Sequence, residues 1–175
     1  IKLSELDLSK LWQEYGKVQT GKSVSGEPAT IQRQTFKDVI GTHAQSILKI
    51  DLHGNATRFH AQVGVADSQV EVSDKSLTIL PLVNGTKLYF RKEGDDKQFI
   101  GLAGKSGKIE NGSVRFVLKG DNKELYNSGI VRGNEAPQSI DVSLKGVRVL
   151  ELAVEPTNDG ASGDNALWIA PTIEY

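Results

Sequence analysis

The chain of 175 residues carries 21 Lys and Arg against 22 Asp and Glu, for a net charge of -1, and it contains 18 Gly, 5 Pro and no Cys. This balance gives no long-range field to attract nucleic acid or an anionic membrane surface, and the lack of cysteine excludes thiol nucleophiles, zinc–thiolate sites and disulfides. Glycines and prolines between short apolar runs favour an all-β protein with frequent turns.

The N-terminal run LSELDLSKLWQEYG predicts the only helical turn, for which Ser4 and Asp7 are alternative caps. No apolar run reaches the 18 or more residues of a membrane span, and no charged-then-apolar leader opens the chain. Because the sequence begins at Ile1 and contains no Met, we expect a mature or excised part of a longer protein.

The next elements are strands with alternating apolar and polar residues. The clearest runs from Thr57 to Val65, and similar alternation marks strands around 48–52, 114–118, 140–144 and 150–154. Turn residues separate them. Short strands at such spacing predict an antiparallel β-sandwich or jelly roll rather than a parallel α/β sheet.

Residues 68–112 differ from the rest of the chain in residue pattern, with a predicted hairpin around Asn84-Gly85 followed by a polar, Gly-rich stretch. We expect this segment to be an insertion between two core strands. The sequence as a whole, residues 1–175, is expected to form a single domain.

His43 lies in the small-residue turn Gly41-Thr42-His43-Ala44, just before a predicted buried strand. A histidine there is a candidate metal ligand, general base, sugar-binding group or satisfied polar group at the edge of a core. The three histidines of the chain lack the spacing of a zinc site. No nucleophile elbow accompanies the triad that Ser46, His43 and Asp51 would form, so the residues favour a non-catalytic module.

The C-terminal run NDGASGDNALW places Asp159, Asp164 and Asn165 in a Gly-rich loop before Trp168. Sugar sites combine an apolar ring face with carboxylate, amide and imidazole groups that bond hydroxyls. Asx turns at the two aspartates and a core position for Trp168 are the alternative.

Several blocks of the chain, in this order and spacing, resemble the NPCBM family of carbohydrate-binding modules, which are appended to glycoside hydrolases such as α-galactosidases. The blocks are LSELDLSK, GKSVSGEPATI, FKDVIGTHAQSILKIDL, TRFHAQVGV with Asp67, GSVRFVLKGDNKELYNSGIV, IDVSLKGVRVLELAV and NDGASGDNALW. The resemblance implies a galactose-binding-like jelly roll that binds sugar through loops at one end of the sandwich.

The resemblance implies the sugar-binding residues His43, Asp67, Asp164, Asn165 and Trp168. It also shows departures from the family pattern. Asp67 is the one acid kept of a usual pair, Asn165 replaces a usual His, and Leu167 replaces a usual Asp. The early Gly-Trp-Gly of many members is here Glu14-Tyr15-Gly16.

A structural calcium site is also implied by the resemblance, at the turn from Lys22 to Thr30. Turn carbonyls and a carboxylate of the last strand would supply hard oxygen ligands. The implied positions are Lys22, Ser25, Thr30 and Glu174, although Ser25 stands where the family commonly has Asp.

The resulting hypothesis is a non-catalytic module that binds galactose-containing glycans and holds an exported bacterial glycoside hydrolase on its substrate. It implies a covalently linked catalytic domain and a secreted, periplasmic or cell-surface location. The alternative is a jelly roll that has lost its sugar site and acts as a spacer or protein-contact surface.

Overall fold

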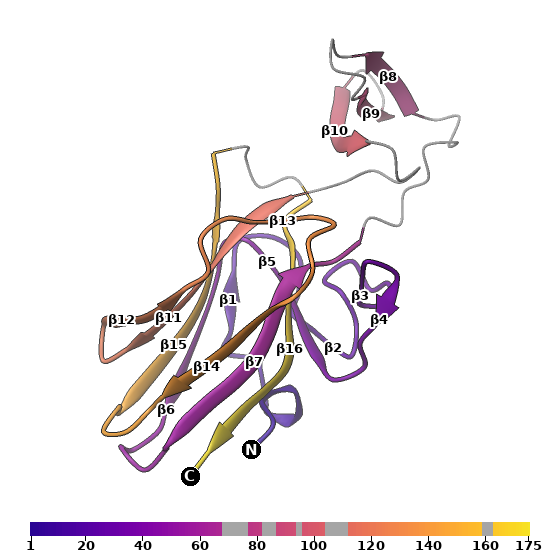
Figure 1. Cartoon of the computed structure of the whole chain (residues 1–175). Coiled ribbons are helices and arrows are strands. Elements are labelled where there is room, and N and C mark those ends of the chain that lie inside the picture. The colour runs from indigo at the N-terminus through magenta and orange to yellow at the C-terminus, as the bar shows by residue number, and fades with distance from the viewer. Residues whose placement is uncertain (68–76, 82–86, 94–95, 104–111, 159–162) are drawn as a thin grey trace.

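A computed structural model describes residues 1–67, 77–81, 87–93, 96–103, 112–158 and 163–175 of the chain. Two antiparallel sheets face each other as a β-sandwich (Figure 1), which confirms the predicted fold class. Sheet A has the order β14 (Gln138–Ser143), β7 (Arg58–Val65), β16 (Asn165–Glu174), β5 (Val39–His43) and β2 (Gln19–Thr20). Sheet B has the order β1 (Trp12–Gln13), β6 (Ser46–Asp51), β15 (Val149–Pro156), β11 (Ser113–Gly120) and β12 (Lys123–Asn127), with β13 (Val131–Arg132) paired to β11.

The main core lies between the two sheets and follows from the alternation in the sequence. Alternate residues of each long strand point to opposite faces, so Phe59 of β7 and Phe116 of β11 meet between the sheets. Trp168 of β16 packs edge-on against these two rings, at centroid distances of 6.4 and 5.1 Å. These aromatic contacts join sheet A to sheet B through the centre of the sandwich.

The N-terminal helical turn is shorter than expected. It is a 3-10 turn, η1 (Leu3–Glu5), and the residues after it run into strand β1. Ser4 does not cap it, because its hydroxyl donates to the carboxylate of Asp38. Asp7 instead accepts the backbone N–H of Ser9. Trp12 therefore lies on an edge strand and not on a helix.

A small hairpin of β3 (Thr30–Ile31) and β4 (Gln34–Thr35) covers part of the outer face of sheet A. A second apolar cluster, separate from the main core, forms between the hairpin region and the sheet; its buried members are Ala29, Ile31, Val39, Ala66, Leu167 and Ile169. A Cβ at Gly64 would lie 2.5 Å from the Cδ1 of Ile31. The missing side chain on β7 thus lets the hairpin approach the sheet closely.

The segment between β7 and β11 contains a separate three-stranded antiparallel sheet of β8 (Leu77–Pro81), β9 (Lys87–Glu93) and β10 (Asp96–Ala103). The expected hairpin corresponds to β8 and β9, and the third strand was not foreseen. The turn residues Asn84-Gly85 lie outside the described residues. Figure 1 shows this small sheet at the end of the sandwich opposite the two termini.

The chain termini meet at one end of the sandwich, which we call the terminal end. The N-terminal ammonium group of Ile1 donates to the carbonyl of Ile173, 2.6 Å away, and Lys2 forms a bridge with Thr172. The opposite end, where β5 finishes and β16 starts, we call the His43 end. Among the described residues, no helix has the length and apolar character that a membrane crossing requires.

Candidate functional site

His43 is the last residue of β5, a strand whose five residues are all buried, and the side chain itself is 6 % exposed. Its Nδ1 lies 2.6 Å from the carbonyl oxygen of Ala44. Because a carbonyl only accepts hydrogen bonds, Nδ1 carries the hydrogen and donates. The imidazole is thus fixed to the turn that follows the strand.

Burial decides the charge of this histidine. Desolvation lowers the pKa of His43 below its usual value of 6.5, and this outweighs the hydrogen bond to Ala44 and the nearby negative charge of Glu14, which act in the opposite direction. The ring is neutral at pH 7. With the hydrogen on Nδ1, Nε2 presents a lone pair, and no residue that the structure describes is bonded to it. His43 can therefore accept one hydrogen bond from a ligand hydroxyl.

Tyr15 lies directly against His43, with ring centroids 5.0 Å apart and planes inclined by 58°. Its side chain is 67 % exposed, more than any other large apolar or aromatic side chain among the residues that the structure describes. The loop that carries it is held on both sides, since Glu14 N–H donates to the Gln45 carbonyl and the Gln13 side-chain amide donates to the Tyr15 carbonyl. The aromatic ring is thus presented to solvent by an ordered backbone.

Asn165 is the Cα partner of His43 across the β16–β5 ladder. Directly opposite residues project from the same face of a sheet, and Val39 and Leu167, at even spacing from them, lie in the outer apolar cluster. His43 and Asn165 therefore project from the outer face of sheet A. Asn165 is half-buried, and its amide can donate and accept.

These residues form a small polar and aromatic group at the His43 end, which we call the Tyr15 group: Glu14, Tyr15, His43 and Asn165. It offers an exposed ring, a neutral acceptor, an amide and a carboxylate. The sequence reasoning missed Tyr15 because it treated Glu14-Tyr15-Gly16 only as a departure from the family pattern. The signal was present as an aromatic residue kept where the family has Trp.

Trp168 does not belong to this group. The side chain is 3 % exposed and lies between the two sheets, so its ring has no face to offer a sugar. The residues on either side of it in β16, Leu167 and Ile169, point to the other face of sheet A. The structure thus corrects the assignment of Trp168 as a sugar-stacking residue: it is the core anchor that the sequence left as the alternative.

The two aspartates among the expected site residues hold the backbone of the loops. Asp164 is fully buried, and its Oδ1 accepts the N–H of Ser113, where the chain returns from the insertion. The carboxylate oxygens of Asp67 accept the N–H groups of Gln32 and Arg33, both at 2.9 Å, in the β3–β4 turn. These bonds make both carboxylates braces of the fold. Asp159 lies outside the described residues.

The expected calcium ligands are not brought together. The backbone of Lys22 lies against Gly41 of β5, whose partner in β16 is Leu167. Glu174 is seven residues further along β16, which at about 3.3 Å per residue is roughly 20 Å away. Ser25 bonds the hydroxyl of Ser23.

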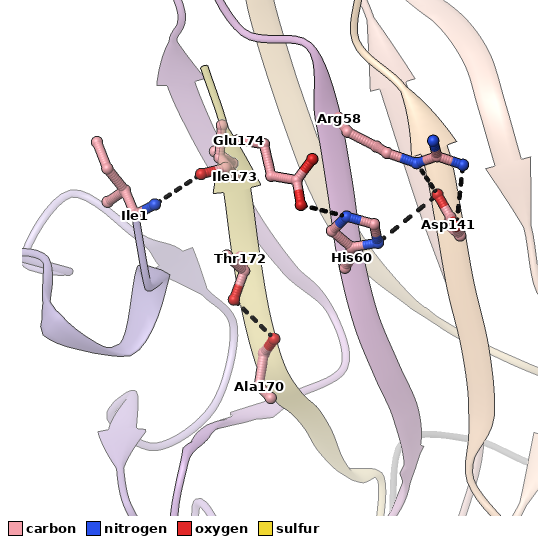
Figure 2. Close-up of polar contacts among 8 residues, drawn as sticks. All are labelled: Ile1, Arg58, His60, Asp141, Ala170, Thr172, Ile173 and Glu174. Carbon is pink, nitrogen blue, oxygen red and sulfur yellow. Dashed lines mark hydrogen bonds and ion pairs between the residues drawn. The ribbon is translucent and has the colours of Figure 1, made fainter.

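Glu174 belongs instead to a polar cluster on sheet A near the terminal end. Figure 2 shows its carboxylate directed at His60, with Oε1 2.9 Å from Nε2. His60 lies in turn beside Asp141, which also pairs with Arg58 through two bonds. Among the described residues, no cluster of three or more His, Cys, Asp or Glu could hold a metal ion. The present residues therefore do not fit the implied calcium, and calcium binding stays a prediction.

Solved structures similar to this one are carbohydrate-binding modules. One is a CBM51 from Clostridium perfringens GH95 in complex with methyl-galactose, with a TM-score of 0.69 at 20 % identity. The match covers 99 % of this chain and 98 % of the chain of that module. CBM51-2 with the INT domains of Clostridium perfringens ZmpB, in complex with GlcNAc, has the same TM-score at 19 % identity, and the match spans 98 % of this chain but 30 % of the longer one. Tandem CBM51 modules of Sp3GH98 from Streptococcus pneumoniae score 0.64 at 18 % identity, over 99 % of this chain and 46 % of that one.

The sequence itself gives the family. A search of curated proteins found no match, but the family model described as NPCBM/NEW2 domain matches residues 1–93 and 84–174. These two stretches together span nearly the whole chain. Family and fold agree on a non-catalytic carbohydrate-binding module of the kind appended to hydrolases. The chain belongs to the NPCBM/NEW2 domain family.

Proposed function

We propose that the module binds a terminal, galactose-type sugar of a glycan through the Tyr15 group. The observation that carries this proposal is the contact between an exposed aromatic ring and a buried, neutral histidine. The similar module from Clostridium perfringens GH95 was solved with methyl-galactose, which supports the choice of sugar class.

The chemistry of the group suits one pyranose ring. The apolar C–H face of the sugar packs on Tyr15, because ring faces attract such surfaces and exclude water from them. A hydroxyl donates to Nε2 of His43, and vicinal hydroxyls bond the Asn165 amide and the Glu14 carboxylate. The exposed position of Tyr15 makes the site shallow, so a single sugar binds with modest affinity.

We further propose that this binding holds a linked, exported bacterial glycoside hydrolase on its substrate. Modules from GH95 and Sp3GH98 share the fold, and linkage converts weak sugar binding into a raised local concentration of enzyme. The alternative is a spacer or protein-contact domain without a sugar site, which the structural character of Trp168, Asp164 and Asp67 favours.

The test compares Tyr15→Ala with Trp12→Ala on a glycan array, followed by calorimetric titration with methyl-galactoside and N-acetylglucosamine. Trp12 is a matched control because it is also an exposed aromatic, 53 % exposed, three residues away on sheet B. Loss of one stacking ring costs about 1 to 2 kcal/mol, so we expect a roughly 5- to 30-fold loss of affinity for Tyr15→Ala. Trp12→Ala should bind as the wild type does.

Equal effects of the two substitutions would contradict a site at Tyr15. An array on which the wild-type module binds no glycan would contradict the sugar-binding function as a whole and would favour the spacer. The relative affinities for the two sugars decide whether the proposed galactose preference holds.

A further inference from the structure

We propose that the module has a second ligand site, on the outer face of sheet B, that takes a sugar carrying an anionic group. The feature behind this inference is a pocket of about 380 Å³ at the His43 end, lined by Ser113, Arg115, Ile130, Arg132, Pro156, Thr157 and Asn158. None of these residues belongs to the Tyr15 group. That the ligand is a sugar rests on the proposed function; that it is anionic rests on the pocket.

Strand register places the two arginines on one face. Val114 and Val131 are fully buried in the main core, so the neighbouring Ser113, Arg115 and Arg132 project outward. Arg132 is the Cα partner of Ser113 in the β11–β13 ladder. Arg115 and Arg132 are therefore diagonal neighbours, whose Cβ atoms lie about 7 Å apart. Two long side chains at that separation can reach the same anion.

The carboxylates beside Arg115 and Arg132 occupy only some of the N–H donors of each guanidinium group. Arg115 Nη1 lies 3.4 Å from Glu155 Oε2, and Arg132 Nη1 lies 4.0 Å from Glu135 Oε1. A guanidinium has five N–H donors in a planar fork, and a carboxylate or sulfate accepts two of them side by side. Each arginine thus keeps donors for a ligand.

The other walls of the pocket suit the rest of a sugar. Ser113 and Thr157, both in the lining, share a hydroxyl hydrogen bond, while the amide of Asn158 adds a donor and an acceptor. Ile130 is 43 % exposed and supplies an apolar part of the lining. The volume lies within the range of small-ligand pockets. The combination fits a monosaccharide with one carboxylate or sulfate substituent.

The experiment follows backbone amide shifts and affinity by NMR titration of the Tyr15→Ala protein, in which the first site is weakened. The carboxylate probe is the methyl α-glycoside of N-acetylneuraminic acid, the sulfate probe is N-acetylglucosamine 6-sulfate, and N-acetylglucosamine is the neutral comparison. We expect an anionic probe to shift the amides of Ser113, Ile130 and Asn158, with at least about tenfold higher affinity than the neutral sugar. Affinity should fall as salt is raised.

Two variants test the pocket independently. Arg132→Gln removes one guanidinium, and Ile130→Glu adds a repelling carboxylate without removing any ion pair; each should weaken the anionic probe about tenfold or more. Arg148→Gln, at an exposed arginine of the β14–β15 turn, is the matched control and should have no effect. The better of the two anionic probes identifies the ligand chemistry.

Equal binding of the neutral and anionic sugars, or unchanged affinity in Arg132→Gln and Ile130→Glu, would overturn this inference. The proposed function fails separately, if Tyr15→Ala leaves methyl-galactoside binding intact. Inorganic sulfate that binds the pocket as tightly as the sulfated sugar would likewise overturn the assignment of a sugar ligand.

Discussion

His43 shows how burial selects one role of a versatile side chain. The ring is held by the Ala44 carbonyl, and desolvation lowers its pKa, so at pH 7 it is a neutral acceptor and not a cation. Sequence reasoning left a metal ligand, a base, a sugar contact and a brace open. The structure makes His43 a braced residue whose second nitrogen keeps a lone pair for a ligand, so the brace and the sugar contact are compatible roles.

The lowered pKa of His43 predicts a specific pH dependence of stability. Between the folded-state pKa and the ordinary value of 6.5, the unfolded chain binds more protons than the folded chain, so stability rises with pH. This contribution is fully present above pH 6.5 and is lost as the pH falls toward the folded-state pKa. We expect chemical denaturation between pH 8 and 5 to show a smaller loss of stability on acidification in His43→Gln than in the wild type. Parallel curves would contradict the assigned pKa direction.

Residue roles were predicted unevenly for a physical reason. The alternation of apolar residues fixes which face of a strand is buried, and within the predicted strand from Thr57 to Val65 the alternate residues Phe59 and Val63 are buried in the core. Trp168 obeys the same alternation, but its aromatic partners come from β7 and β11, far away in the sequence. The same holds for Tyr15 and His43, whose contact joins a loop to the end of β5, two parts of the chain that local pattern does not connect.

At the scale of elements, close approach of the 21–36 segment to sheet A depends on two glycines. A Cβ at Gly41 would lie 2.3 Å from the backbone carbonyl of Lys22, whereas a Cβ at Gly64 would meet the terminal methyl of the Ile31 side chain. A backbone group cannot move without moving its turn, while a side-chain end can rotate away. An added methyl group should therefore lower the free energy of unfolding more at Gly41 than at Gly64.

We therefore expect Gly41→Ala to reduce the free energy of unfolding by about 1 to 3 kcal/mol, the usual range for overpacking, and Gly64→Ala to reduce it by less. Urea denaturation of both variants measures the difference, with the wild type as the reference. Equal losses at the two positions would show that the turn near Lys22 yields as easily as a side chain.

Elements themselves were largely predictable from the sequence. Runs of alternating residues corresponded to β6, β7, β11, β14 and β15, and the turns between them carried Gly and Asn. The short strands β1, β2, β3 and β4 were missed, since two residues are too few to show a period. The third strand of the insertion was missed because its stretch is polar and Gly-rich.

For the whole molecule, the insertion leaves and returns at neighbouring points. Val65, two residues before the last described residue of that stretch, bridges Gly133, and Gly133 N–H donates to the carbonyl of Gly112. Because the two boundaries share this one partner, the gap between them is short. We propose on this basis that residues 1–175 form one domain in which the insertion can be removed.

The prediction is that replacement of residues 68–111 by about five Gly and Ser residues, which span up to roughly 17 Å, leaves the sandwich folded. The Tyr15 group lies outside the removed segment, so affinity for methyl-galactoside should stay within about twofold of the wild type. Near-UV circular dichroism and calorimetric titration check the two claims. Loss of folding or of sugar binding would show that the insertion is part of the core or of the site.

The contact between Ile1 and Ile173 has a further consequence for any larger protein that contains this module. Strand β16 runs for ten residues from Asn165 to Glu174, about 30 Å, so both chain ends emerge that far from the Tyr15 group. A tether attached at either end pulls on the same side of the sandwich. The proposed sugar site consequently faces away from its anchor whether the module precedes or follows its neighbour, and domain order can change without turning this site inward.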